Sequence, residues 1–271
     1  MNVEDDIKRI AGLLAASRRV LFVTGAGISA DSGLPTYRGV AGLYEGKGTE
    51  DGLPIEDALS GEVFATRPEV TWKYLAQLER NCRGAAPNAA HRVIAELENR
   101  LPFVQVFTQN VDGLHRKAGS RNLIEVHGSL NELYCPGCGY RTPVESLEGW
   151  EIPPRCPECA GVLRPDVVLF GEMLPFGAVD QLLETLAEGV DMVFAIGTTA
   201  VFPYVAQPVV AAAEAGVPTV EINPAQTRLS EYVAFRLAMR AAAAMTAIME
   251  KLPPPPAAGA RPHRGVSRPG A

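Results

Sequence analysis

The segment RVLFVTGAGISA, residues 19–30, is the clearest indication of the fold in this sequence. Its first half is a short apolar run of the kind that forms a buried parallel strand. Its second half matches the pattern G-x-G-x-x-G/A, with Gly25, Gly27 and Ala30 in the three small positions. The first glycine permits a tight turn, the second lets the backbone approach a pyrophosphate, and the following helix attracts the anion. The stretch therefore predicts a nucleotide-binding turn, and a tight turn without a ligand is the alternative.

Apolar runs of the same kind recur along the chain, with helical patterns between several of them. Further strands are predicted at residues 103–108, 122–126, 192–196 and 218–222. Helices are predicted at residues 3–17, 88–100, 179–188 and 204–215. This alternation predicts an α/β fold with a Rossmann-like, doubly wound parallel sheet.

Two stretches interrupt the alternation, and we expect them to form a smaller lobe of helices and a zinc ribbon. One is rich in glycine, with short helices expected around residues 55–59 and 69–82, and the other carries four cysteines. The predicted large lobe comprises residues 1–36, 86–132 and 164–252, and the predicted small lobe comprises residues 37–85 and 133–163. An Ala-rich helical region is expected at 230–252, and the Pro/Arg-rich tail, 253–271, is predicted to be disordered.

The composition limits the possible partners and compartments. The chain has 271 residues and a net charge of −6, which argues against direct binding of nucleic acid. No uninterrupted apolar stretch is long enough to span a bilayer, and the first residues do not resemble a signal peptide. We therefore expect no membrane partner and a cytoplasmic location.

Four of the five cysteines form two Cys-x-x-Cys pairs, Cys135 with Cys138 and Cys156 with Cys159. Each pair can supply two thiolates to one tetrahedral Zn²⁺, and four thiolates leave no open position for a substrate water. The pattern predicts a structural zinc ion, with two redox pairs or four free thiols as alternatives. Cys82 stands apart and is predicted to be a buried apolar residue.

A polar cluster is predicted where two strands end. Gln109, Asn110 and Asp112 follow one strand, and His127 follows the next. Because ligands bind at the carboxyl ends of the strands in such sheets, these side chains should converge near the glycine loop. A histidine there can act as a general base near neutral pH, although a structural role is the alternative.

The adenosine side of the predicted site is less clearly marked. No acidic residue ends a second strand about twenty residues after the glycine loop, so the usual ribose ligand is missing. Asn223 is a candidate for that contact. The segment from Gly197 to Thr199 follows a strand and suits phosphate or ribose contacts, or serves only as a helix cap.

These motifs together resemble one family, the sirtuins or Sir2-type NAD-dependent protein deacylases, in their bacterial form. The resemblance covers the chain to about residue 252. Besides the two cysteine pairs, it rests on GAGISADSGLPTYRG (25–39), TQNVDGLH (108–115), EVHG (125–128), LRPDVVLFGE (163–172), GTT (197–199) and EINP (221–224).

The resemblance implies roles for the candidate residues. Contacts with NAD are implied for Gly25, Ala26, Gly27, Asp31, Thr36, Tyr37, Arg38, Gln109, Asn110, Asp112, Gly197, Thr198, Thr199 and Asn223. His127 is implied as the catalytic base, and Asn110 is implied to take part in catalysis from the nicotinamide pocket. A strand edge that binds the acyl-lysine peptide by β-addition is implied for Val168, Phe170, Gly171 and Glu172.

The implied reaction removes an acyl group from protein lysine. The acyl carbonyl oxygen attacks the anomeric carbon of NAD as nicotinamide leaves, and His127 takes a proton from a ribose hydroxyl. The products are free lysine, nicotinamide and O-acyl-ADP-ribose, and the substrates are acyl-lysine proteins or peptides. Family members are often monomers, and we expect a monomer here.

Two departures from the family bear on specificity. Tyr37 stands where Phe is common in the loop that shields the site. The Tyr-x-x-Arg pair of sirtuins that prefer succinyl or malonyl lysine is absent, because the matching positions are Leu75 and Leu78, or Tyr74 and Gln77 after a one-residue shift. Neutral acyl groups, acetyl first, are therefore predicted.

Two alternative functions remain at this stage. The same cofactor would serve a protein ADP-ribosyltransferase or an NAD hydrolase, in which the acceptor differs. A non-catalytic NAD-sensing or zinc-ribbon interaction module is the other alternative, although such a module has no need of a base at His127.

Overall fold

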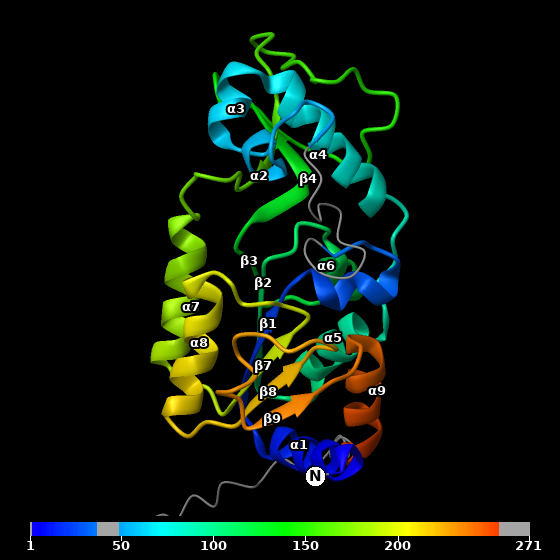
Figure 1. Cartoon of the computed structure of the whole chain (residues 1–271), viewed down its shortest axis with the longest axis vertical. Coiled ribbons are helices and arrows are strands. Elements are labelled where there is room, and N and C mark those ends of the chain that lie inside the picture. Colours follow the sequence, from blue (N-terminus) through cyan, green and yellow to red (C-terminus); the bar gives the residue numbers. More distant parts are fainter. Residues whose placement is uncertain (1, 37–48, 255–271) are drawn as a thin grey trace, which may run out of the picture.

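The computed structural model describes residues 2–36 and 49–254. The chain forms two lobes stacked along its long axis, with the large parallel sheet in one and the helices α2 (Ile55–Ala58), α3 (Gly61–Thr66) and α4 (Pro68–Cys82) in the other (Figure 1). The predicted α/β class is confirmed by this arrangement.

The large sheet has six strands in the order β3-β2-β1-β7-β8-β9, and every pair in it is parallel. Its strands are β1 (Arg19–Thr24), β2 (Phe103–Thr108), β3 (Leu123–Glu125), β7 (Met192–Ile196), β8 (Thr219–Ile222) and β9 (Phe235–Leu237). The order reverses at β1, where β2 lies on one side and β7 on the other. Ligands bind at such a reversal in open α/β sheets.

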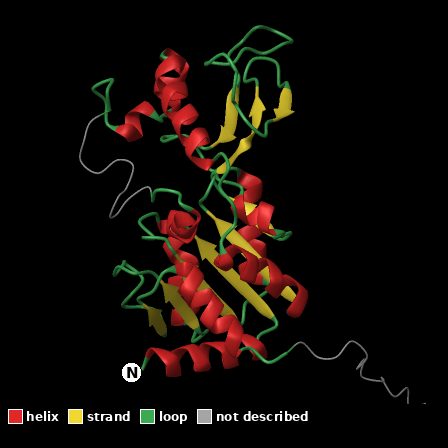
Figure 2. Cartoon of the chain, turned by 90° about the vertical axis from the view of Figure 1, so that its right-hand side faces the viewer, coloured by secondary structure: helices red, strands yellow, loops and turns green. Residues whose placement is uncertain are grey.

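Helices cover both faces of this sheet, as the two views show (Figures 1 and 2). One face is covered by α1 (Val3–Ala16), α5 (Ala89–Arg100) and α9 (Ala241–Lys251). The other is covered by α7 (Phe176–Ala187) and α8 (Pro203–Glu214). The strands are therefore buried on both sides, which explains why their sequences are apolar without alternation.

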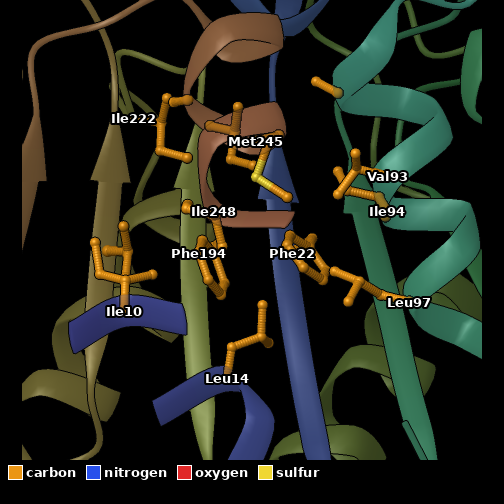
Figure 3. Close-up of a cluster of buried hydrophobic side chains, with 14 of the residues drawn as sticks. Ile10, Leu14, Phe22, Val93, Ile94, Leu97, Phe194, Ile222, Met245 and Ile248 are labelled. Atoms are coloured by element: carbon orange, nitrogen blue, oxygen red, sulfur yellow. The ribbon is translucent and has the colours of Figure 1, made fainter. Parts of the chain in front are cut away.

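The larger core lies between the sheet and the first group of helices (Figure 3). At its centre Phe22 of β1 stacks on Phe194 of β7, with ring centroids 4.8 Å apart. Leu14 of α1 lies below the two rings and Ile10 lies to the side of Phe194 (Figure 3), and both side chains are fully buried. Each such side chain contributes about 1.5–3 kcal/mol by leaving water, so this core fixes the strands whose ends form the site.

The small lobe has a core of its own. It contains α2 (Ile55–Ala58), α3 (Gly61–Thr66), α4 (Pro68–Cys82) and a three-stranded antiparallel sheet of β4 (Gly128–Tyr134), β5 (Arg141–Pro143) and β6 (Arg164–Val167). Trp72 of α4 is fully buried there, and its indole N–H donates to the Leu163 carbonyl at 2.8 Å. This bond ties the helices of the lobe to the chain that leaves the cysteine-bearing segment.

Several local expectations need correction. The helix predicted after the glycine loop is a 3-10 helix, η1 (Ala26–Ser32). The region 230–252 is not helical throughout, because it includes β9 before α9 begins. The small sheet, α3 and the short helix α6 (Leu114–Ala118) carried no clear sequence signal. The small sheet also takes in residues 128–132 and 164–167, which the predicted boundaries placed with the large lobe. The boundaries themselves remain a prediction.

Candidate functional site

A cavity of about 440 Å³ opens at the carboxyl ends of β1, β2 and β7, beneath the small lobe. Many of the predicted site residues line it. They are Gly25, Ala26, Thr36, Gln109, Asn110, Asp112, His127, Val168, Phe170, Gly171, Glu172, Gly197, Thr198 and Thr199. Gly27, Asp31 and Asn223 lie outside its lining, and Tyr37 and Arg38 fall outside the described residues.

The glycine loop packs directly against the loop that follows β7. The Gly27 N–H donates to the Gly197 carbonyl at 2.8 Å. A Cβ atom on Gly27 would lie 2.6 Å from the Cα of Gly197, and one on Gly25 would lie 2.9 Å from the Gly197 carbonyl oxygen. Gly197 itself has φ +61°, a conformation that side chains other than glycine rarely adopt. The three glycines are thus required by the contact between two loops of the protein, a reason that the sequence pattern did not indicate.

Asn110 and Asp112 meet around Ser29, a residue that the sequence analysis did not single out. Ser29 is buried in η1, and its hydroxyl donates to Asp112 Oδ2 at 2.7 Å. The Asn110 amide nitrogen contacts the Ser29 hydroxyl at 3.3 Å and the Gly25 carbonyl at 3.2 Å. The other oxygen of Asp112 caps α6 through the Leu114 N–H. Ser29 thereby fixes the orientation of both polar side chains at the floor of the cavity.

A second set of hydrogen bonds links β2 to β7 and β8. The Gln109 amide donates to Thr198 Oγ1 at 2.9 Å, and Thr198 Oγ1 also accepts from the Ala200 N–H. The Asn223 amide donates to the Thr198 carbonyl at 3.2 Å. Asn223 therefore supports the cavity wall through Thr198.

His127 lies between β3 and β4, two residues after β3 ends and directly before β4 begins. Its Nδ1 is 2.9 Å from the Gln109 carbonyl oxygen, and its Nε2 is 2.7 Å from the hydroxyl of Tyr204. Burial lowers the pKa of His127, and the Gln109 carbonyl partly opposes that shift. A neutral imidazole with one nitrogen free to accept a proton is the form that a general base requires.

Tyr204 was not predicted as a site residue. It lies in the first turn of α8, lines the same cavity and stacks on Phe202, with ring centroids 5.5 Å apart. The sequence placed it only within an apolar helical pattern, so its hydroxyl gave no signal.

Asp31 is engaged elsewhere. Its carboxylate accepts from Arg240 Nη1 at 2.8 Å and from the Ala242 N–H at 3.1 Å. It therefore caps the first turn of α9, where a negative charge is favourable. Its part in the cofactor loop stays a prediction.

The segment predicted to bind peptide begins just after β6. The Val168 N–H donates to the His127 carbonyl at 2.9 Å. Phe170 pairs through both its N–H and its carbonyl with the chain around Ser60. Glu172 forms a bidentate ion pair with the buried Arg164, at 2.6 and 2.8 Å. Burial alone would raise the pKa of Glu172, but the ion pair outweighs it and the pKa is lowered. Glu172 thus holds the segment in place.

The four paired cysteines converge in the small lobe. Their sulfur atoms lie within 4.8 Å of one another, with Cys135 and Cys159 3.4 Å apart and Cys138 and Cys156 3.5 Å apart. No disulfide joins them. Four sulfur donors at this spacing fit a structural Zn²⁺. Cys82 is half-buried on α4 and lines the cavity, and burial raises its pKa to about 12.

The parallel sheet, the interlocked glycine loops and the cysteine cluster define a Rossmann-like nucleotide-binding protein with a zinc-ribbon lobe. Comparison with known proteins identifies the family. The family model described as "Sir2 family" matches residues 25–203, and the chain belongs to this family.

Similar proteins cover almost the whole chain. "NAD-dependent protein deacylase 2" of Pseudomonas aeruginosa is 51% identical over 245 residues, covering 89% of this chain and 95% of that protein. "NAD-dependent protein deacylase" of Aeropyrum pernix is 40% identical, covering 85% and 91%. A solved Sir2 homolog–NAD complex is 36% identical, with a TM-score of 0.79 and coverage of 90% and 93%. In the part of the chain that the structure describes, no helix is long and apolar enough to cross a membrane.

Proposed function

We propose that this chain is an NAD-dependent protein-lysine deacylase. The observation that carries the proposal is the placement of His127, which presents one nitrogen as a base in the cavity that also contains the glycine loop, Asn110 and Asp112. The curated relatives are named NAD-dependent protein deacylases, and a solved Sir2–p53 peptide–NAD⁺ complex, 29% identical, has a TM-score of 0.78 and coverage of 90% and 98%. An acyl-lysine substrate accords with both.

NAD, when bound, supplies an ADP-ribose group that accepts the acyl chain. We assign its pyrophosphate to the turn at Gly25–Gly27, where η1 begins. The carboxamide of the nicotinamide is assigned to Asp112 and Asn110, which Ser29 orients. Thr198 and Thr199 are assigned to the adenosine side. Thr36 is the last described residue of the loop predicted to close over the cofactor. Tyr37 and Arg38 are predicted to belong to the same loop and lie outside the described residues.

His127 performs the proton transfer in this proposal. The Gln109 carbonyl can only accept a hydrogen bond, so Nδ1 carries the proton of the neutral ring and Nε2 is the basic atom. Burial keeps the pKa of His127 low, so the base is unprotonated at neutral pH. Its target is a ribose hydroxyl, whose oxygen then attacks the acylated carbon.

The wall of the cavity favours a neutral acyl group. Leu75 and Leu78 of α4 line it, together with Leu59, Leu130 and Val167. Among the described residues of this lining there is no arginine or lysine. A succinyl or malonyl carboxylate would therefore enter an apolar wall without a cationic partner, which is costly. Acetyl-lysine is the preferred substrate in this proposal.

The peptide is expected to lie along Val168, Phe170, Gly171 and Glu172. The backbone N–H and carbonyl of Phe170 are both hydrogen-bonded to the chain around Ser60. A peptide that adds as a strand would therefore pair with the backbone of the residues next to Phe170. A monomeric state and a cytoplasmic location remain predictions.

The test is mass spectrometry of an acetyl-lysine peptide incubated with and without NAD, beside a succinyl peptide of the same sequence. We expect NAD-dependent loss of acetyl with O-acetyl-ADP-ribose appearing, and its collapse in His127→Ala. A succinyl preference would contradict the reading of the cavity wall. Nicotinamide release without deacylation of either peptide, or of longer acyl chains, would favour an ADP-ribosyltransferase or NAD hydrolase. Binding of NAD without any turnover would favour a sensor.

A further inference from the structure

The basic atom of His127 is already occupied in the structure. Because the Gln109 carbonyl fixes the proton of the neutral ring on Nδ1, Nε2 can only accept. The oxygen of Tyr204 lies 2.7 Å from Nε2, so the tyrosine hydroxyl donates to it. A substrate hydroxyl can therefore reach Nε2 only by displacing Tyr204 or by acting through it.

Displacement of Tyr204 by a substrate hydroxyl would disturb an aromatic ring that packs against two others. The Tyr204 ring stacks on Phe202 nearly in parallel, at an interplanar angle of 13°. It meets the edge of the His127 ring at 85°, with centroids 6.0 Å apart. Pro203 begins α8 at the preceding position, where its fixed φ suits the first helical turn. The tyrosine is thus positioned by its own helix and by two rings, with its hydroxyl in the cavity.

We propose that Tyr204 and His127 act as one proton-accepting unit, in which the Tyr204 hydroxyl passes the proton of the ribose hydroxyl to Nε2 of His127. This inference rests on the proposed deacylase function. The ribose O–H bond breaks as a new O–H bond forms on Tyr204, and the original tyrosine proton moves to Nε2. The ribose oxygen keeps the electron pair with which it attacks the acyl carbon, and Tyr204 is a neutral phenol before and after the transfer.

Two further features suit this transfer. Burial raises the pKa of Tyr204 to about 12, so its hydroxyl stays protonated and able to donate. Once the proton has arrived, the buried imidazolium has two N–H groups, and each already faces an acceptor, the Gln109 carbonyl and the Tyr204 oxygen. A buried charge needs such partners, and they are in place without any rearrangement.

The first experiment compares Tyr204→Phe with the wild type in two reactions. Deacylation of an acetyl-lysine peptide uses the base, and we expect its kcat to fall about ten- to hundredfold, up to the lower end of general-base effects, because His127 itself is retained. Exchange of labelled nicotinamide into NAD on the same peptide does not use the base, and we expect it to stay within about twofold. A deacylation kcat within about twofold of the wild type would overturn the inference. Tyr232→Phe, on a tyrosine that is 53% exposed, is the matched control and should leave both reactions unchanged.

A double-mutant cycle separates a shared proton path from two independent effects. In a single unit, Tyr204→Phe combined with His127→Ala should be no slower than His127→Ala alone. A multiplicative loss would refute the unit. Wild-type protein that fails to deacylate would instead refute the proposed function.

One measurement reads the wild-type protein directly and does not depend on activity. The ¹⁵N chemical shifts of labelled histidines in the wild type, with His127 assigned by its absence in His127→Gln, report which ring nitrogen carries the proton. The Nδ1–H form is expected for His127. The Nε2–H form would show that Tyr204 does not donate to the base, and would overturn the inference.

Discussion

Acid should destabilise this protein between pH 6.5 and 4 through two buried histidines behind the site. His91 and His115 are 0% and 2% exposed, and their rings meet edge to face with centroids 4.8 Å apart. Burial lowers the pKa of His91 to about 4 and, with the nearby His91, lowers that of His115 to about 3. A second proton would be poorly accommodated on either ring. On His91 it would displace the Asn88 N–H that Nδ1 accepts, and on His115 it would sit on Nδ1, which has no hydrogen-bond partner among the described residues.

The magnitude follows from linkage. In the unfolded chain each histidine takes up a proton below its ordinary pKa of 6.5, whereas in the folded chain each stays neutral until pH 4 or below. The stability due to the neutral pair is therefore fully present above pH 6.5 and is lost as the pH falls. At pH 5, one and a half units below the unfolded value, each histidine costs about 2 kcal/mol and the pair about 4 kcal/mol.

Urea unfolding followed by far-ultraviolet circular dichroism at pH 7.5, 6, 5.5 and 5 measures this loss. The variant His115→Gln keeps a polar side chain but removes one titrating group, so its slope in this window should be about 1.4 kcal/mol per pH unit shallower. Protonation of zinc ligands affects both proteins alike and cancels in the difference. Equal slopes for the two proteins would refute the reasoning.

Two further predictions concern the zinc cluster and the glycine loops. Chelation of zinc, or the substitution Cys138→Ser, should unfold the small lobe and shift the fluorescence of Trp72 and Trp150. The control Cys82→Ser should retain one zinc ion by metal analysis, and native fluorescence in zinc-free protein would contradict a structural ion. Gly27→Ala should lower the free energy of unfolding in urea by about 1–3 kcal/mol, because the added methyl group meets Gly197. The control Gly12→Ala, which has open space around it on α1, should raise that free energy by about 0.5–1 kcal/mol. An unchanged free energy for Gly27→Ala would show that the two loops can move apart without loss of stability.

The large lobe could be predicted from the sequence because each of its central strands is buried on both faces. Such strands read as apolar runs, and the predicted runs at 19–24, 103–108 and 192–196 coincide with β1, β2 and β7. The small sheet could not be predicted in the same way. β5 and β6 have only three and four residues, and the chain that joins them carries two of the four clustered cysteines, Cys156 and Cys159. A metal can order such a segment without the apolar periodicity that marks strands.

The site, too, contains residues that the sequence could predict and residues that it could not. Sequence motifs identified side chains that the proposed reaction requires, such as His127, and the structure brings them into one cavity. Ser29 and Tyr204 were missed because their neighbours in space are far away in the sequence. The hydroxyl of Ser29 meets Asp112 across 83 positions, and that of Tyr204 meets His127 across 77. No local pattern carries such a contact, and only the topology of the sheet creates it.

The interlocked loops at Gly27 and Gly197 leave no room for a Cβ atom between them, whereas Leu75 and Leu78 of the cavity wall come from α4 in the other lobe. The floor is therefore preorganised and tolerant of very little substitution, while the wall can exchange one side chain for another without touching it. The residues assigned to the cofactor and those assigned to acyl selectivity can therefore change independently in evolution. Under the proposed function, substitutions on α4 should change the acyl preference and leave the interlocked glycine loops unaltered.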